Sequence, residues 1–125
     1  MSDRQTILVV EDDEDLRRLF RTALILGGFD VIEAGDGLEA LLRIDQSPPD
    51  LVVLDLMLPR LSGIAVQQEI AAQAVTRQIP VVVITGSGID PTGMQVACFL
   101  RKPVSPEQLL EVVRECITAG AHGPV

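Results

Sequence analysis

Four positions of this chain carry side chains that could do chemistry together. Residues 11–15 are all acidic, Asp55 closes an apolar run, Thr85 closes another, and Lys102 follows a third. Carboxylates that crowd without a partner repel one another, and a hard divalent cation with oxygen ligands, Mg²⁺ above all, relieves that repulsion. A phosphoryl group brought to such a metal needs a compact cation and a hydroxyl donor for its remaining oxygens, which Lys102 and Thr85 supply.

Asp55 has two possible roles. It interrupts the apolar stretch LVVLDLMLP of residues 51–59, which is typical of a central strand buried on both faces. A carboxylate at the C-terminal end of such a strand emerges in the crevice where open α/β sheets bind ligands. An Asp ahead of a proline-containing loop also often caps the turn. The choice depends on whether other acids and a cation reach the same edge of the sheet.

Lys102 is the only lysine among the ten basic residues of the chain. A lysine is a compact point charge that can bridge a carboxylate and a phosphate where the planar fork of an arginine would not fit. This choice of residue favours a function for Lys102, and random drift is the alternative explanation.

The elements that must position these residues alternate between apolar runs and segments of helical periodicity. We expect strands at residues 6–10, 30–33, 51–55, 80–84 and 97–101, and helices that begin near Asp36, near Ser62 and at residues 105–107, with a first helix that stops at the glycines 27–28. Strands alternating with helices predict an α/β fold with a five-stranded parallel sheet, doubly wound. Right-handed crossovers bring the C-terminal strand ends, and with them the four positions, to one edge.

The connection between the last two strands is short. Residues 86–96 number about eleven, whereas a parallel crossover normally takes a dozen or more residues including its helix. Three glycines and a proline fall within this stretch and disfavour a helix interior. We therefore expect the fourth helix to be short or missing.

The composition limits the possible functions. The net charge of −8 argues against a surface for nucleic acid, because phosphate binding needs clustered Lys and Arg. The N-terminus does not have the pattern of a signal peptide, and no apolar run approaches the length of a membrane span. Cys98 and Cys116 fit neither a disulfide framework nor a zinc site, so reduced thiols and a cytoplasmic location are the default expectation.

The whole chain is expected to form one domain. A length of 125 residues allows one core and is too short for two. We place the core at about residues 6–119 and expect residues 120–125 to form a frayed tail. The initial Met and the lack of a linker after residue 119 favour a single-domain protein, and a receiver module cut from a larger regulator or hybrid kinase is the alternative.

Taken in order, the motifs closely resemble the receiver domain of two-component response regulators, of the single-domain type. The matching stretches are ILVVEDDEDLRRLF, AGDGLEALL, PDLVVLDLMLP, IPVVVIT and FLRKPVSPEQLL, and they extend over residues 6–119. The resemblance implies a flavodoxin-like fold with strand order 2-1-3-4-5. It also implies a phosphoacceptor switch, not an enzyme: Asp55 receives a phosphoryl group from a sensor histidine kinase or a histidine phosphotransfer protein. The chain then changes its surface for an unknown downstream protein target.

The same resemblance assigns residues to a Mg²⁺ site. Asp12 and Asp55 would bind the ion with their side chains, Glu11 would reach it directly or through water, and Met57 would offer its backbone carbonyl. Lys102 would hold the phosphoryl oxygens.

The resemblance also assigns residues to the response. Thr85 would help hold the phosphoryl oxygens and Phe99 would be the switch aromatic, with simple packing of Phe99 as the alternative. The peptide between Lys102 and Pro103 would be cis.

Two other functions compete with the phosphoacceptor switch. A Mg²⁺-dependent phosphohydrolase of the haloacid dehalogenase type would need a second Asp two residues after the nucleophile, where this chain has Met57. A flavin-binding module of the flavodoxin type would need backbone donors after the first strand, where Glu11, Asp12 and Asp13 would repel the phosphate. Both are therefore disfavoured.

Overall fold

The computed structural model describes residues 4–86 and 93–122, with side chains as far as Thr118. Strands and helices alternate along these residues as β1 (Thr6–Val10), α1 (Glu14–Leu26), β2 (Asp30–Ala34), α2 (Gly37–Gln46), β3 (Leu51–Asp55), α3 (Gly63–Ala72), β4 (Val81–Thr85), β5 (Cys98–Arg101) and α4 (Pro106–His122). The helix α4 continues beyond residue 119, where the core was expected to end.

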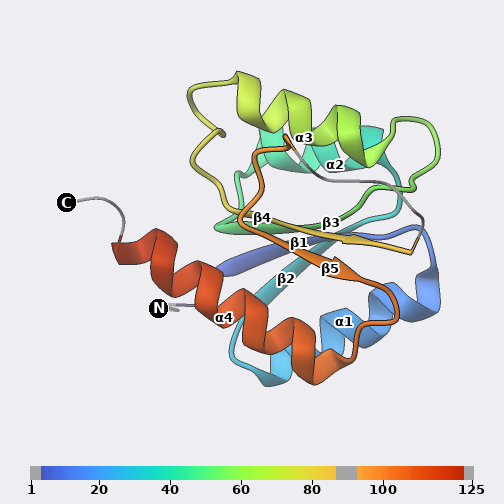
Figure 1. The fold of residues 1–125 in the computed structure, drawn as a ribbon, viewed down its shortest axis with the longest axis vertical. Coiled ribbons are helices and arrows are strands. Elements are labelled where there is room, and N and C mark those ends of the chain that lie inside the picture. Colours follow the sequence, from blue (N-terminus) through green and yellow to red (C-terminus); the bar gives the residue numbers. More distant parts are fainter. Residues whose placement is uncertain (1–3, 87–92, 123–125) are drawn as a thin grey trace.

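The strands form a parallel sheet with helices on both faces. Within the described residues the sheet has five strands in the order β2-β1-β3-β4-β5. Helices α1 and α4 cover one face, and α2 and α3 cover the other (Figure 1). The doubly wound sheet and its strand order confirm the expected fold, and every strand delivers its C-terminal end to the same edge.

The apolar runs of the central strands are explained by burial on both faces. Along β3, Leu51 and Val53 pack in the core beneath α1 and α4, whereas Val52 and Leu54 pack in the core beneath α2 and α3. Successive side chains of a strand point to opposite faces, so a strand covered on both sides must be apolar throughout. Every residue of β3 and β4 is buried, which fixes the ends of these strands rigidly.

The helix ends follow local chemistry. Asp36 accepts a hydrogen bond from the Glu39 N–H and caps α2, and Ser62 does the same for α3 through the Ala65 N–H. Gly27 ends α1. The helix starts expected at Asp36 and Ser62 are thus confirmed.

Three strand boundaries differ from the expected ones. β4 begins at Val81 and not at residue 80, because Pro80 has no N–H for the ladder, although its carbonyl accepts from Val52 at 3.0 Å. β2 continues to Ala34, which pairs with Val10. β5 begins at Cys98, one residue later than expected.

The crossover between β4 and β5 has no helix in its described part. Gly86 and residues 93–97 are turns, bends or irregular chain. The rest of the expected short or missing helix falls on residues 87–92, which lie outside the described residues.

Two further sequence expectations concern composition. Cys98 and Cys116 are free and partly buried, and burial raises the pKa of the Cys116 thiol. None of the described helices is both long and apolar enough to cross a bilayer.

Candidate functional site

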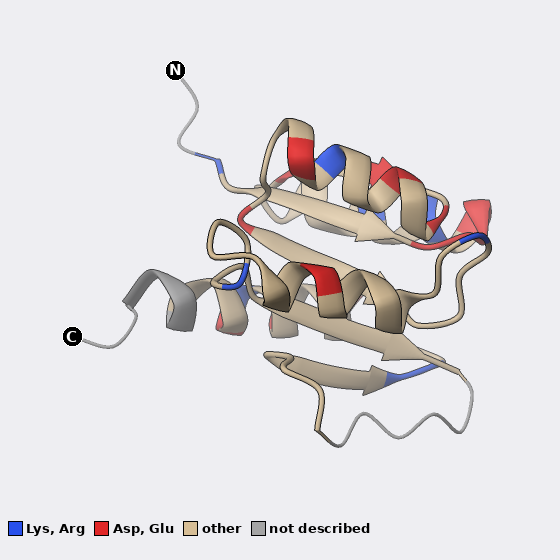
Figure 2. Cartoon of the chain, turned by 90° about the horizontal axis from the view of Figure 1, so that it is seen from above, with Lys and Arg blue, Asp and Glu red and all other residues tan. Residues whose placement is uncertain are grey.

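The candidate site lies at the sheet edge where the C-terminal ends of β1, β3 and β5 meet. In Figure 2 the acidic segment that follows β1 lies at the end of the sheet to which the arrowheads point. An open hollow of about 450 Å³ lies there, and its lining residues are Glu11, Asp12, Asp13, Asp55, Met57, Gly86 and Lys102. The convergence expected from the sequence is therefore present for the acids and for the lysine.

Asp55 is the buried centre of this hollow. It is the last residue of β3 and only 3% exposed. Its Oδ1 accepts a hydrogen bond from the Met57 N–H at 3.0 Å, and its Oδ2 accepts one from Lys102 Nζ at 2.9 Å. One oxygen therefore holds the following turn, as the capping alternative expected, while the other faces the Lys102 ammonium in the hollow.

Gly63 holds the chain close behind Asp55. A Cβ atom at this first residue of α3 would lie 2.3 Å from the backbone oxygen of Asp55 and 2.6 Å from Leu56 Cα. No side chain larger than hydrogen fits there without moving the end of β3. The tight approach of α3 thus sets where the Asp55 carboxylate emerges.

We expect Gly63→Ala to destabilise the chain by about 1–3 kcal/mol, the usual cost of overpacking. An alanine in an open helical position would instead stabilise by up to about 1 kcal/mol, because it lowers the entropy of the unfolded chain. Urea unfolding of both proteins measures the sign of the change. A gain in stability would contradict the close approach of α3 to Asp55.

Glu11 is the second buried acid. It is 2% exposed, its Oε1 lies 2.8 Å from Lys102 Nζ, and its Oε2 accepts the Asp13 N–H at 3.1 Å. Burial raises the pKa of Glu11, and the hydrogen bonds from Lys102 and Asp13 only partly offset it. A cation beside Glu11 therefore favours the ionised form of its carboxylate.

Lys102 provides that cation. Burial alone would lower the pKa of its ammonium, but the hydrogen bonds to Glu11 and Asp55 outweigh it and hold the pKa above its ordinary value. The backbone N–H of Lys102 also donates to the Thr85 carbonyl at 3.0 Å, which ties the end of β5 to β4. Lys102 is thus charged and fixed at both its backbone and its head group.

Asp12 completes a set of carboxylates that could hold a metal ion. One oxygen each of Glu11, Asp12 and Asp55 lies within 4.8 Å of the others, and Asp12 is exposed at the mouth of the hollow. Hard oxygen ligands with an open side fit Mg²⁺, which usually keeps several waters and takes only one or two protein carboxylates. The donor set therefore fits the expected ion.

Of the other expected site residues Thr85, Met57 and Phe99, Met57 is among the residues that line the hollow, and Thr85 and Phe99 are not. Thr85 is fully buried at the end of β4, and Met57 is 56% exposed on the loop after β3. Phe99 is partly buried and packs in the core beneath α2 and α3, with the Arg101 guanidinium carbon 5.2 Å from its ring centroid. The peptide between Lys102 and Pro103 is cis, as expected. Phe99 is thus packed against the core, and its role as the switch aromatic stays a prediction.

Arg17 is a site neighbour that the sequence analysis missed. Its Nη1 donates to the Glu11 carbonyl at 2.7 Å and its Nε donates to Glu33 Oε1 at 3.1 Å. A signal existed, because Arg17 lies at helical spacing from the buried Phe20 and Leu24 and so on the inner face of α1.

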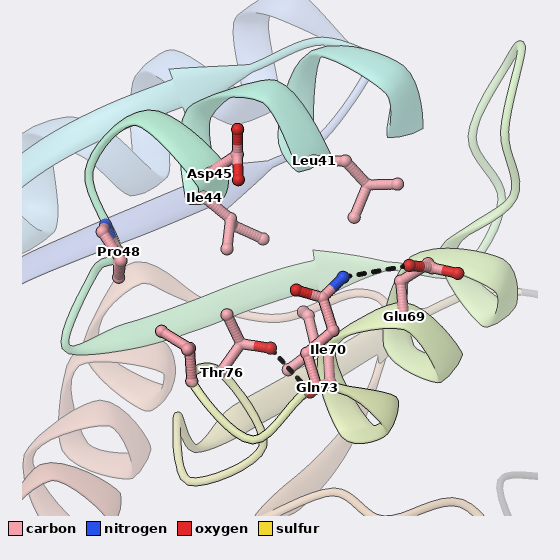
Figure 3. Close-up of a pocket in the computed structure, with 9 residues that line it drawn as sticks. Leu41, Ile44, Asp45, Pro48, Glu69, Ile70, Gln73 and Thr76 are labelled. Carbon is pink, nitrogen blue, oxygen red and sulfur yellow. Dashed lines mark hydrogen bonds between the residues drawn. The ribbon is translucent and has the colours of Figure 1, made fainter.

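A second concavity has a different character. It measures about 320 Å³ between α2 and α3 (Figure 3), and its acids Asp45 and Glu69 come from helices. Its hydrogen bonds join Gln73 to Glu69 and Thr76 to the Ile70 carbonyl, so they hold α3 and its following turn together. The strand-end acids are not among its lining residues.

Comparison with known proteins gives consistent results. The family described as "Response regulator receiver domain" matches residues 7–114. A probable transcriptional regulator, ycf27 of Porphyridium aerugineum, is 36% identical over an alignment of 119 residues that covers 91% of this chain and 48% of the relative. The chain thus spans about half the length of the curated relatives it matches.

Solved structures agree with this match. The receiver domain of NtrX from Brucella abortus superposes with a TM-score of 0.82 and 32% identity, covering 90% of this chain and 98% of that one. A CheY-like receiver domain protein from Methanospirillum hungatei gives a TM-score of 0.90 at 22% identity, with 96% and 98% covered. The latter supports the fold alone.

Proposed function

This chain belongs to the response regulator receiver domain family, and from that premise we propose that it is a phosphoacceptor switch in which Asp55 takes up a phosphoryl group. One observation carries the proposal. Lys102 Nζ lies 2.9 Å from Asp55 Oδ2 and 2.8 Å from Glu11 Oε1 at an open hollow. Phosphoryl transfer to a carboxylate needs a fixed cation beside it and a path for the donor, and here the ammonium lies beside a carboxylate that lines an open hollow.

Mg²⁺ is the proposed cofactor. The carboxylates of Glu11, Asp12 and Asp55 would hold it, and the backbone carbonyl of Met57 would be a further ligand. The bound ion would neutralise charge between the acids and the incoming phosphoryl oxygens. The proximity of the three carboxylates supports this assignment.

The chain's own residues would act on the phosphoryl group as follows. An Asp55 oxygen attacks phosphorus, a P–O bond forms, and the bond between phosphorus and the donor breaks so that its electron pair leaves with the donor. Lys102 and the Thr85 hydroxyl would hold the phosphoryl oxygens. The hydrogen bond from the Met57 N–H to Asp55 Oδ1 keeps the carboxylate oriented, which lowers the entropic cost of the attack.

The proposed partners are proteins. A sensor histidine kinase or a histidine phosphotransfer protein would supply the phosphoryl group. Thr85 and Phe99 would then change the surface of the chain, and a downstream protein would recognise that changed surface. The relative from Porphyridium aerugineum is named a transcriptional regulator, and this chain covers 48% of it. A net charge of −8 repels phosphates, so we do not propose that this chain contacts nucleic acid directly.

A phosphohydrolase remains the weaker proposal. Met57 occupies the position where that chemistry needs an acid, and its side chain is 56% exposed. Turnover is therefore proposed to be limited to phosphorylation and dephosphorylation of the chain itself.

The Mg²⁺ requirement tests the proposed function. We expect acetyl phosphate to add one phosphoryl group to the chain, seen by intact mass, after Mg²⁺ is restored to protein treated with EDTA. Without the ion the three acids repel the incoming phosphoryl oxygens, so we expect at least about a tenfold slower reaction. Potassium chloride at matched ionic strength is the control. Equal incorporation in EDTA would contradict the proposal.

A further inference from the structure

We infer that Arg17 is a positioning residue for the metal ligands of this chain: its guanidinium fixes the backbone of Glu11, and thereby the direction in which Glu11 and Asp12 present their carboxylates. The inference rests on the proposed function, because it concerns the acids proposed to hold Mg²⁺. Arg17 itself would not contact the ion.

The contacts of Arg17 join three elements. From α1, its Nη1 donates to the Glu11 carbonyl just after β1, and its Nε donates to Glu33 near the end of β2. The distances are 2.7 Å and 3.1 Å, and the Arg17 side chain is 19% exposed. Charge-assisted hydrogen bonds at this distance and burial are strong and directional.

The Glu11 peptide is held from both sides. Its N–H donates to the Ala34 carbonyl at 3.1 Å, and its own carbonyl accepts from Arg17. Asp12 follows directly, so a shift of the Glu11 peptide would also shift the backbone from which the Asp12 carboxylate extends. Loss of Arg17 would leave the carbonyl of the buried Glu11 without this donor and would free the acidic loop to move.

Glu33 keeps Arg17 in place. Its carboxylate accepts from Arg17 through Oε1 and lies 3.4 Å from Arg21 Nε through Oε2. The two arginines are one helical turn apart on α1 and both form ion pairs with the Glu33 carboxylate. Glu33 is therefore the anchor that sets the orientation of the Arg17 fork.

Positioning and plain electrostatics predict opposite signs. Arg17 is a cation near the acids, so removing its charge should strengthen the binding of a divalent cation if charge alone matters. If Arg17 holds the ligands in place, removing it should weaken that binding, because ligand-orienting contacts outside the coordination sphere typically contribute about 10–100-fold to metal affinity. The sign of the change therefore separates the two explanations.

Arg18 offers a matched control. It neighbours Arg17 on the same helix and carries the same charge, but its side chain is 63% exposed and forms an ion pair with Glu14 one turn away. Arg18→Met thus removes the same charge from α1 without touching the Glu11 peptide.

The test is a titration of the full chain with Mg²⁺. The amide chemical shifts of Asp12 and Asp55 in ¹H–¹⁵N spectra report the binding at each step. We expect Arg17→Met to raise the Mg²⁺ Kd about tenfold and Arg18→Met to leave it within about twofold. Glu33→Gln should raise the Kd by a smaller factor, and it keeps the test open if Arg17→Met fails to fold. The double variant Arg17→Met/Glu33→Gln should bind Mg²⁺ no more weakly than the Arg17→Met chain.

The outcomes separate the inference from the proposed function. If the unaltered chain shows no saturable Mg²⁺ binding, both are overturned. If it binds Mg²⁺ and the Arg17→Met and Glu33→Gln chains bind equally well or more tightly, only the role of Arg17 is overturned. An equal loss in Arg18→Met would also overturn it, because Arg18 pairs with Glu14 and makes no contact with the Glu11 peptide, so the loss would not come from positioning that peptide.

Discussion

Asp55→Asn is expected to abolish phosphorylation of this chain by acetyl phosphate. The amide lacks the negative oxygen that attacks phosphorus, and its N–H₂ group would face the Lys102 ammonium now bonded to Asp55 Oδ2. The loss should be complete within the detection limit of intact-mass spectrometry. Peptide mapping of the unaltered chain should place the phosphoryl group on Asp55.

Asp30→Asn is the control for this variant. Asp30 opens β2 at the opposite end of the sheet, and its side chain is 53% exposed. We expect full phosphorylation of that variant. A phosphoryl adduct that persists in the Asp55→Asn chain would show that another group is the acceptor and would remove the basis of the proposed function.

Lys102→Arg is expected to slow phosphorylation at least about tenfold although the positive charge is kept. One ammonium nitrogen now contacts both Glu11 and Asp55, at 2.8 Å and 2.9 Å. A planar guanidinium is larger than an ammonium and spreads its donors over a rigid fork, so its hydrogen bonds do not start from a single nitrogen. Arginine therefore cannot occupy the same space with the same contacts.

Rates of phosphoryl incorporation measured for Lys102→Arg and for Arg18→Lys form a matched pair. Arg18 is an exposed surface residue paired with Glu14, so the reverse exchange there should have no effect. A Lys102→Arg chain as fast as the unaltered one would mean that any cation suffices, and drift would then explain the single lysine.

Much of the fold could be predicted because each local signal agreed with the tertiary environment. The uninterrupted apolar runs of β3 and β4 reflect burial on both faces, and Asp36 and Ser62 cap helices through their own side chains. The strand order came from the family resemblance, since no local pattern specifies which strands become neighbours. The start of β4 was placed one residue early because the apolar periodicity does not register the N–H that Pro80 lacks.

Part of the candidate site could also be predicted from the sequence, and part of it could not. Glu11, Asp12, Asp55 and Lys102 could be found because each ends or follows a strand, and parallel strands share one C-terminal edge. Arg17 was missed because its partners, Glu11 and Glu33, come from two different strand ends, and only the packed structure joins them. Core packing of Phe99 was one of the two alternatives considered from the sequence, and the structure shows that packing.

The lysine that bridges Glu11 and Asp55 also bears on how this chain folds. Two buried carboxylates at one strand edge would ordinarily oppose folding until a cation arrived from solution. Here the counter-ion is Lys102, the residue that follows β5. When β5 pairs with β4, the Lys102 ammonium comes to lie beside both acids. We therefore expect this chain to fold without added metal ions, because the Lys102 ammonium offsets part of the charge of the two buried acids.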